Sequence, residues 1–166
     1  MTASPEHLFE FLDELAVAYE TVHHEATFTV EEGRSLKKTM PGGHTKNLFM
    51  KDKDGVIVLI SAHAESVIKL NQLHKFIGTR RLSFASAELM EEVLGVVPGS
   101  VTGFALMNDK AGRVRFILDA ALEAYDEVNF HPLVNTATTR ISLSDFKKFV
   151  AATGHKLTVL NFEALV

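Results

Sequence analysis

The residue types with the clearest chemical potential lie just after a Pro-Gly-Gly corner at positions 41–43. The four polar residues there are His44, Thr45, Lys46 and Asn47. An apolar run begins at Leu48, so a core strand would fix the backbone directly after these polar groups, and the glycines would let a ligand approach closely. The same stretch also fits a solvated loop before an ordinary hairpin. On its own it is a candidate binding site and nothing more specific.

A glycine-rich connection at residues 95–103 is the second candidate. It lacks the Gly-x-x-x-x-Gly-Lys-Ser/Thr pattern of a phosphate-binding loop, and it would lead from a helix to a strand, the reverse of the order that such a loop needs. Nucleotide hydrolysis is therefore disfavoured. The connection could instead offer backbone amides to a ligand carbonyl, and it could equally be a tight turn.

Histidine and carboxylate chemistry is less well defined. His131 precedes a proline that favours an extended backbone, and it could bind a substrate, orient a water molecule or serve only the structure. The eight histidines show no His-x-x-x-His spacing, and the adjacent His23 and His24 would point apart on a strand, so a metal hydrolase is a weak alternative. No Gly-x-Ser-x-Gly elbow supports a serine nucleophile. Asp119 is one of several acids that could be a base, and the sequence singles out none.

Composition limits the class of protein. The 166 residues are 46% hydrophobic, and no apolar run approaches the roughly 20 residues that a membrane span needs. Cysteine is absent, which excludes disulfides, thiolate metal sites and cysteine nucleophiles. The amino terminus carries no basic and apolar signal, so a cytoplasmic protein is the expectation.

The net charge is −4, but basic residues gather in two places. The first group, with Asp52 as its only acid, is Arg34, Lys37, Lys38, Lys46, Lys51 and Lys53. The second group is Lys69, Lys75, Arg80 and Arg81. Such a face could receive a polyanion, or it could be a solvated fringe without a partner.

Periodicity and capping residues predict the elements that must position these groups. Ser4 and Pro5 open an amphipathic helix over residues 5–18, and the Asp-Gly pair at 54–55 predicts a hairpin. The remaining helices are expected at 29–39, 65–77, 86–95 and 142–154, and the strands at 48–51, 56–61, 101–107, 114–118 and 156–161, with extended pieces at 19–24 and 128–132. The sequence thus predicts one α+β domain over residues 1–166, with a mixed, largely antiparallel sheet.

Five motifs, read together, carry a family resemblance. In chain order they are His44-Thr45-Lys46-Asn47-Leu48-Phe49, Arg81-Leu82-Ser83-Phe84-Ala85, Leu94-Gly95-Val96-Val97-Pro98-Gly99-Ser100-Val101-Thr102, Asn108-Asp109 and Asn129-Phe130-His131-Pro132. Each is weak alone, but the ordered set resembles the YbaK/ProX family, the free-standing relatives of the editing domain inserted in bacterial prolyl-tRNA synthetase. The resemblance spans about residues 21–161, and the branch it matches is that of ProX-type proteins that deacylate alanyl-tRNA(Pro).

The resemblance implies a barrel-like sheet flanked by helices and an aminoacyl-tRNA hydrolase that needs no metal or other cofactor. Lys46 matches the family lysine that engages the tRNA 3′ end near the scissile ester, Asn47 matches its supporting asparagine, and His131 matches the family histidine. The family loop written Gly-x-x-x-Pro matches Gly99 to Gly103. Gly103 therefore replaces the proline, a departure that bears on loop rigidity and on the tightness of amino-acid selection.

The expected site residues divide into three groups. Those expected to act in catalysis are Lys46, Asn47, Gly99 and His131. Those expected to bind the substrate are His44, Thr45, Phe49, Ser100, Val101, Thr102, Gly103 and Phe130. Those expected to bind tRNA are Arg34, Lys37, Lys38, Lys51, Arg80 and Arg81. The expected partners are the 3′ end and acceptor stem of tRNA(Pro), with prolyl-tRNA synthetase as a candidate partner. Association with a membrane is not expected.

An aminoacyl ester is already activated, so its hydrolysis needs a positioned water, donors for the developing oxyanion and phosphate contacts rather than a metal. We expect Lys46 to hold the 3′ end, the amides of residues 99–103 to stabilise the oxyanion, and a ribose hydroxyl to help orient the water. A small pocket would reject amino acids larger than alanine by overlap, with Phe49, Met50 or Phe130 as its walls. The alternatives are a deacylase for another small amino acid, such as cysteine on tRNA(Pro), and a non-catalytic module that binds aminoacyl-tRNA or regulates its use.

Overall fold

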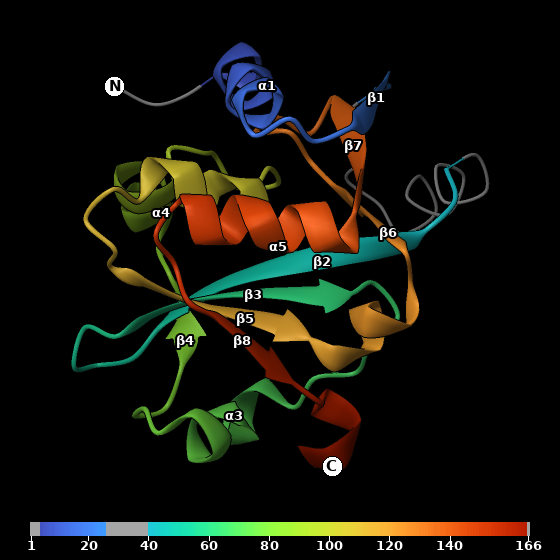
Figure 1. Ribbon diagram of the computed structural model, residues 1–166. Helices are drawn as coiled ribbons and strands as arrows, with labels where there is room; N and C mark the ends of the chain where they lie inside the picture. The colour runs from blue at the N-terminus through green and yellow to red at the C-terminus, as the bar shows by residue number, and fades with distance from the viewer. Residues whose placement is uncertain (1–3, 26–39, 166) are drawn as a thin grey trace.

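The computed structural model describes residues 4–25 and 40–165, and the helix expected at 29–39 lies outside them. Its α-helices are α1 (Pro5–Glu14), α3 (Leu70–Ile77), α4 (Ala87–Leu94) and α5 (Leu143–Ala152). Its strands are β1 (Tyr19–His23), β2 (Gly43–Lys51), β3 (Ile57–His63), β4 (Ser83–Phe84), β5 (Val114–Asp119), β6 (Glu127–Phe130), β7 (Ala137–Ser142) and β8 (Leu157–Leu160). The 3-10 helices are η1 (Gly103–Asn108), η2 (Ala120–Ala124) and η3 (Phe162–Leu165) (Figure 1).

The strands form one mixed sheet in the order β1-β7-β6-β2-β3-β5-β8, and β4 pairs with β2 outside this path. Four of the pairings are antiparallel (β1–β7, β6–β7, β2–β3 and β2–β4) and three are parallel (β2–β6, β3–β5 and β5–β8). The expected α+β class with a mixed sheet and flanking helices is confirmed. The barrel-like closure is wrong, because β1 and β8 lie at opposite ends of an open sheet.

Successive side chains of the central strands enter two different cores, as the alternation of a strand requires. Phe49 joins the larger core, which includes residues of α1, α4, α5 and η1. Met50 joins the smaller core, which includes residues of α3 and η3. Figure 1 shows α1, α4 and α5 on one side of the sheet, and α3 with the carboxyl-terminal segment on the other. These two sides are named the α5 face and the α3 face below.

Aromatic packing dominates the α5 face. Phe104, Phe130, Phe146 and Phe149 are each at most 1% exposed, and the rings of Phe130 and Phe146 are stacked with centroids 4.3 Å apart. Burial of a phenylalanine side chain stabilises a fold by about 1.5–3 kcal/mol, and ring pairs add to this. This cluster therefore fixes α5 and η1 rigidly over β6 and the middle of the sheet.

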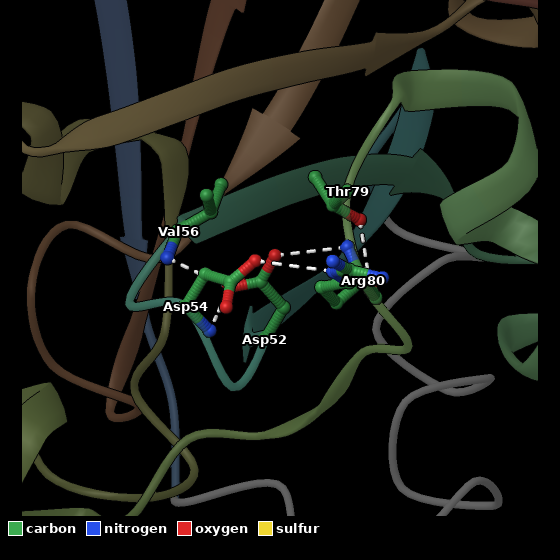
Figure 2. A network of polar contacts seen from close by, with 5 residues as sticks. All are labelled: Asp52, Asp54, Val56, Thr79 and Arg80. Carbon is green, nitrogen blue, oxygen red and sulfur yellow. Dashed lines mark hydrogen bonds and ion pairs between the residues drawn. The ribbon is translucent and has the colours of Figure 1, made fainter.

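The β2–β3 hairpin forms as expected from its Asp-Gly pair. Gly55 adopts a φ of 88°, a left-handed conformation that favours glycine. The buried carboxylate of Asp52 accepts the backbone N–H groups of Asp54, Val56 and Arg80, each at 2.9 Å (Figure 2). Burial would raise the pKa of Asp52, but these hydrogen bonds together hold it below its usual value. Asp52 thus closes the hairpin and ties it to the segment after α3.

Several elements differ from the expectation. Strand β2 begins at Gly43 rather than at residue 48, and β4 and β7 were not expected. Helix α1 ends at Glu14 rather than at residue 18, because the chain reverses at Ala16, whose φ is 57°. Helix α3 begins at Leu70 rather than at 65. The strand expected at 101–107 is largely the 3-10 helix η1, which Thr102 caps by accepting the N–H of Phe104. A short apolar run is compatible with either a strand or a buried helical turn, and only tertiary packing decides. No helix in the described ranges has both the length and the apolar character to cross a bilayer.

Candidate functional site

The four polar residues from His44 to Asn47, called the polar quartet below, lie where the sheet is interrupted. On one edge of β2, the pairing with β6 covers Gly43 and His44, and the pairing with β4 covers Met50 and Lys51. Between these two short partners, residues 45–48 of that edge are registered with no strand in the described part of the chain. The opposite edge is continuously paired with β3 from Thr45 onward. The predicted site therefore lies on a stretch of β2 that has no partner strand on one edge in the described residues and is firmly held on the other edge.

The side chain of Lys46 lies on the α3 face, because Lys46 and Met50 are an even number of residues apart on one strand and Met50 lies on that face. Its half-buried side chain donates from Nζ to the backbone carbonyl of Ser66, in the turn after β3. Ser66 in turn donates from Oγ to the carboxylate of Asp119. The ammonium group is therefore held by a neutral acceptor, at a position that a charged ligand could compete for.

Asp119 organises the turn that receives Lys46. This carboxylate is 2% exposed at the end of β5. Besides the Ser66 hydroxyl, it accepts the N–H of His63 at 3.0 Å and the N–H of Ala121 at 2.9 Å. The sequence could not choose among the acids; in the structure the lone pairs of Asp119 are engaged by the backbone and Ser66, so it positions the site rather than acting as a free base.

Asn47 belongs to a different network on the α5 face. Its Oδ1 accepts a hydrogen bond from the hydroxyl of Ser61, the residue opposite it on β3. Its Nδ2 donates to Thr45 Oγ1 at 3.3 Å, and Thr45 donates to the carbonyl of Asn129 at 2.7 Å. The network thus crosses β3, β2 and β6 in sequence. Lys46 and Asn47, adjacent in the chain, serve opposite faces of the sheet.

The Pro-Gly-Gly corner is packed against the protein itself. A Cβ on Gly42 would lie 2.8 Å from the carbonyl oxygen of Glu127, and one on Gly43 would lie 3.0 Å from the ring of Tyr125. Asn129 Nδ2 donates to the carbonyl of Pro41 at 3.0 Å. The expectation that these glycines leave room for a ligand is therefore wrong at this corner, because the neighbouring backbone and ring occupy that room. His44, just beyond, contacts the carbonyl of Met40 through Nε2 at 2.9 Å.

The carboxyl-terminal end of the glycine-rich loop, at Gly103, contacts the hydrogen-bond network of Asn47. A Cβ on Gly103 would lie 3.1 Å from Ser61 Oγ and 2.7 Å from Phe146 Cζ. A proline would carry that Cβ, so the departure from the family pattern fits the space left by Phe146. At the other end of the loop, Gly99 is exposed with a φ of 92°.

The intervening residues of the loop are largely enclosed. Ser100 and Thr102 are buried, and Val101 is partly exposed. Thr102 Oγ1 accepts the N–H of Phe104 and so has a capping role. The structure brings the Gly103 end of the loop against Ser61, the partner of Asn47, while the role of the Gly99 amide stays a prediction.

His131 follows β6 at the same level of the sheet as Lys46. The parallel register pairs His44 with Asn129, and each of the two candidates lies two residues further along its chain. The Nδ1 of His131 lies 3.0 Å from the carbonyl oxygen of Ala137. Burial lowers the pKa of His131, and the nearby His24 lowers it further, although the hydrogen bond to Ala137 acts in the opposite direction. The imidazole is thus a neutral group with Nδ1–H donating and Nε2 as its acceptor nitrogen.

Two of the expected substrate-binding side chains lie in the core. Phe49 is 2% exposed and Phe130 is 1% exposed, both on the α5 face. Met50, the third wall considered, is 2% exposed on the other face. None of the three lines the pocket that contains Ser66, and each is almost completely buried, so these side chains support the site from beneath.

A pocket of about 560 Å³ opens at the carboxyl ends of β3, β5 and β8. Ser66, the acceptor for Lys46, is one of its lining residues, together with His63, Tyr125 and Asn161. His63 and Tyr125 have stacked rings and a 2.9 Å contact between Nε2 and the phenol oxygen. None of the expected site residues lines this pocket. The signal that marks it, parallel strands ending at one edge, became visible only with the strand order.

Asn108 and Asp109 of the resemblance have structural roles. Asn108 Nδ2 donates to the carbonyl of Leu94 at 2.8 Å, at the end of α4. Asp109 accepts the N–H groups of Arg113 and Val114 and lies 2.8 Å from His155 Nε2. Burial would raise the pKa of Asp109, but the contact with His155 and the two amides hold it below its usual value. The motif closes the turn before β5.

The expected tRNA-binding residues lie away from Lys46 where the structure describes them. Arg34, Lys37 and Lys38 are outside the described residues. Lys51, Arg80 and Arg81 are exposed and lie around the hairpin end of β2. Lys51 is five residues from Lys46, about 17 Å along the strand. In the described ranges no group of three His, Cys, Asp or Glu side chains could hold a metal ion.

Comparison with known proteins places these features in a family. The family model described as the aminoacyl-tRNA editing domain matches residues 24–149. The chain is 41% identical over 157 residues to the prolyl-tRNA synthetase associated domain-containing protein 1 of Mus musculus, with 92% of each chain covered. It is 33% identical over 145 residues to the prolyl-tRNA editing protein ProX of Acetoanaerobium sticklandii, covering 87% of this chain and 88% of the relative.

A solved structure shows the same fold. It is described as a candidate trans-editing enzyme for prolyl-tRNA synthetase, and it superposes with a TM-score of 0.70 over 97% of this chain and 99% of its own. Its sequence identity to the chain is 20%, so this likeness bears on the fold alone.

Proposed function

Because the chain belongs to the aminoacyl-tRNA editing domain family, we propose that it is a trans-editing deacylase that hydrolyses mischarged alanyl-tRNA(Pro). The observation that carries the proposal is Lys46, whose ammonium group rests on the Ser66 carbonyl at the opening beside β2. The names of the relatives, which refer to prolyl-tRNA synthetase and prolyl-tRNA editing, support tRNA(Pro) as the substrate and the synthetase as the supplier of the mischarged product.

Lys46 is suited to hold a phosphate of the tRNA 3′ end. In the free protein its ammonium group donates to a neutral carbonyl. A phosphate oxygen would replace that neutral acceptor with an anionic one, which adds attraction between two opposite charges to a hydrogen bond whose donor is already ionised. The buried Asp119 keeps the Ser66 turn in place, so Lys46 is confined near the opening before substrate arrives.

Hydrolysis then needs a water molecule and oxyanion donors rather than a covalent nucleophile. His131 supplies a neutral imidazole whose acceptor nitrogen can orient water, since its Nδ1–H is committed to Ala137. The backbone amides of the loop from Gly99 to Gly103, apart from that of Ser100, which donates to the carbonyl of Val97, supply the donors for the developing oxyanion. A ribose hydroxyl of the terminal adenosine assists in placing the water.

Selection for alanine follows from the dense packing behind the site. Gly103 lies against Phe146 with no room for a Cβ, and Phe130 stacks on the same ring. A pocket backed by such dense packing cannot widen to admit a bulkier side chain, so it excludes larger amino acids by overlap, whereas it cannot strongly reject a smaller one. Cysteine is close to alanine in size, so it is the competitor that the assay must include.

The test is release of labelled amino acid from alanyl-, cysteinyl- and prolyl-tRNA(Pro) at micromolar protein. We expect rapid release of alanine, slower release of cysteine and no release of proline. Lys46→Ala should abolish the release, while Lys156→Ala, an exposed lysine on another edge of the protein, should not. If the wild-type protein bound the tRNAs but released no amino acid, a non-catalytic aminoacyl-tRNA-binding module would replace the enzyme.

A further inference from the structure

His24, the residue directly after β1, is hydrogen-bonded to the start of β7 through both its backbone and its side chain. Its N–H donates to the carbonyl of Thr136 at 2.9 Å. Its Nε2 lies 2.8 Å from the hydroxyl oxygen of Thr138, which is buried on the neighbouring strand. Thr136 and Thr138 are the two residues that flank Ala137. His24 therefore holds the chain on both sides of Ala137.

Ala137 in turn holds His131 from the other edge of β7. Successive carbonyl groups of a strand point to opposite edges, so the carbonyl of Thr136 faces β1 and that of Ala137 faces β6. The oxygen of Ala137 lies 3.0 Å from Nδ1 of His131. Ala137 is 1% exposed. Strand β7 thus connects His24 on one edge with His131 on the other through a single buried residue.

The turn from β6 to β7 needs such support from outside. Residues 131–136 belong to no helix or strand, and Leu133 in this turn adopts a φ of 70°. A leucine in the left-handed region is strained and persists only where its surroundings hold it. The contacts of His24 are made at the end of this turn, where it enters β7. They therefore help to fix the conformation that brings the Ala137 carbonyl to His131.

The contacts of His24 also fix which of its nitrogens carries hydrogen. Nδ1 lies 2.6 Å from the carbonyl oxygen of Glu25, which can only accept, so Nδ1 donates. Nε2 of the neutral imidazole then accepts the hydrogen of the Thr138 hydroxyl. The rings of His24 and His131 are tilted by 53° with centroids 6.5 Å apart, within the range of interacting ring pairs. His24 is thus held at both nitrogens and lies beside the ring of His131.

We propose that His24 is a positioning residue, which fixes the carbonyl of Ala137 and so holds His131 with hydrogen on Nδ1 and with Nε2 available to a water molecule. Which ring nitrogen of a histidine carries the hydrogen is set by its hydrogen-bond partners, and a displaced Ala137 carbonyl would release Nδ1. The effect on His131 rests on the contacts described above. Its consequence for hydrolysis of the aminoacyl ester rests on the proposed function.

The test measures the tautomer of His131, from the nitrogen chemical shifts of its isotope-labelled imidazole, together with kcat and KM for alanyl-tRNA(Pro). His24→Ala should raise the share of His131 with hydrogen on Nε2 at least about twofold. It should lower kcat at least about fivefold, because a small displacement of a catalytic group from its productive position is costly. KM should stay within about twofold, since the binding of the substrate by Lys46 is unchanged.

Two changes on β7 separate the hydroxyl contact from general packing. Thr138→Val removes the hydroxyl and should reproduce the changes in tautomer and kcat, whereas Thr138→Ser keeps it and should retain the wild-type values. The double variant His24→Ala/Thr138→Val should lose no more kcat than either single variant, as expected of two residues that act through one contact. Melting temperatures show that each variant compared is folded.

The matched control is His23→Ala, which removes the neighbouring imidazole. His23 is exposed and lies on the opposite face of β1, so neither the tautomer nor kcat should change. An unchanged tautomer in His24→Ala and Thr138→Val, or an equal change in His23→Ala, would overturn the proposal. A changed tautomer with full kcat would overturn its catalytic part. If the wild-type protein released no amino acid, the proposed function would fail, while the tautomers would still decide whether His24 positions His131.

Discussion

The two ends of β2 satisfy their polar groups in different ways. At the hairpin end, the carboxylate of Asp52 accepts three backbone N–H groups and is almost completely buried. At the other end, the ammonium of Lys46 rests on one neutral carbonyl, beside an edge with no registered partner strand in the described ranges. One end is closed by its own backbone, and the other presents a charge whose partner can be exchanged.

This difference separates the charges that stabilise the fold from those that are available to bind a substrate. A buried carboxylate that accepts several backbone N–H groups resists removal, because its loss leaves those donors unsatisfied. A cation on a neutral acceptor loses little if that acceptor is replaced, and gains when the replacement is anionic. The same strand therefore combines a structural terminus and a functional one.

The largest expected effect tests the functional terminus. Lys46→Ala should lower kcat/KM for alanyl-tRNA(Pro) by at least about 100-fold, because Lys46 holds the 3′ end and misplacement of a substrate by about 1 Å can cost that much. Its melting temperature should change little, since the partner carbonyl of Ser66 stays accessible to water. Lys51→Ala, at the other end of the strand, should affect mainly binding and its salt dependence. Equal losses of kcat in the two variants would remove the distinction between the ends.

The second prediction compares two buried carboxylates. Asp119→Ala should destabilise the protein by about 1–3 kcal/mol, because it leaves the buried N–H groups of His63 and Ala121 without an acceptor. It should also lower kcat, because the turn that contains Ser66 and receives Lys46 loses its anchor. Asp52→Ala should lower the urea midpoint without lowering kcat of the folded enzyme. Urea unfolding and single-turnover deacylation separate the two outcomes. Full kcat in folded Asp119→Ala would show that the turn does not position Lys46.

The third prediction concerns packing behind the Asn47 network. Gly103→Ala should cost about 1–3 kcal/mol of stability, since its Cβ would lie 2.7 Å from Phe146 Cζ. Phe146→Leu in the same chain should restore part of that loss, giving a favourable coupling energy in a double-mutant cycle. Additive effects of the two changes would mean that the ring is not what excludes the side chain.

The smallest expected effect is a shift in pH dependence. The pKa of His131 is lowered by burial, so its neutral form persists as the pH falls through about 6.5, the ordinary value. The acidic limb of kcat/KM should therefore have its midpoint below about 6.5, and it should disappear in His131→Gln, whose residual activity is flat there. A wild-type midpoint above that value would contradict the assignment of a neutral imidazole.

Local signals predicted the local parts of this molecule. The Asp-Gly turn at 54–55 and the serine caps of α1, α4 and α5 depend on neighbours within a few residues, and each is present. The apolar run at 101–107 was misassigned because burial on all sides makes a 3-10 helix and a core strand alike in sequence. Its identity depends on Phe146, more than forty residues away.

The sequence allowed the residues of the site to be identified, but not their positions relative to one another in the fold. The quartet from His44 to Asn47 was found from its glycine corner and polar types. That Lys46 and Asn47 face opposite sides could have been read from strand alternation, had the strand been expected to start at 43 rather than 48. Ser61 lies opposite Asn47 in the expected hairpin, so it follows once the register is known. Ser66 and Asp119 could not have been found, because their contact depends on the parallel pairing of β3 with β5, which leaves no short-range signal.

The pairing of β1 with β7 delays the folding of β1 during synthesis of the chain. Tyr19 of β1 is registered with Ile141 of β7, so the first strand has no partner until most of the chain exists. At a synthesis rate of about 5–20 residues per second, β1 waits roughly 6–24 s after its own emergence from the ribosome. During that interval α1 and β1 are exposed to chaperones and to other nascent chains. The pairing of β1 therefore forms late, and only β8, which is synthesised after β7, can join the sheet later.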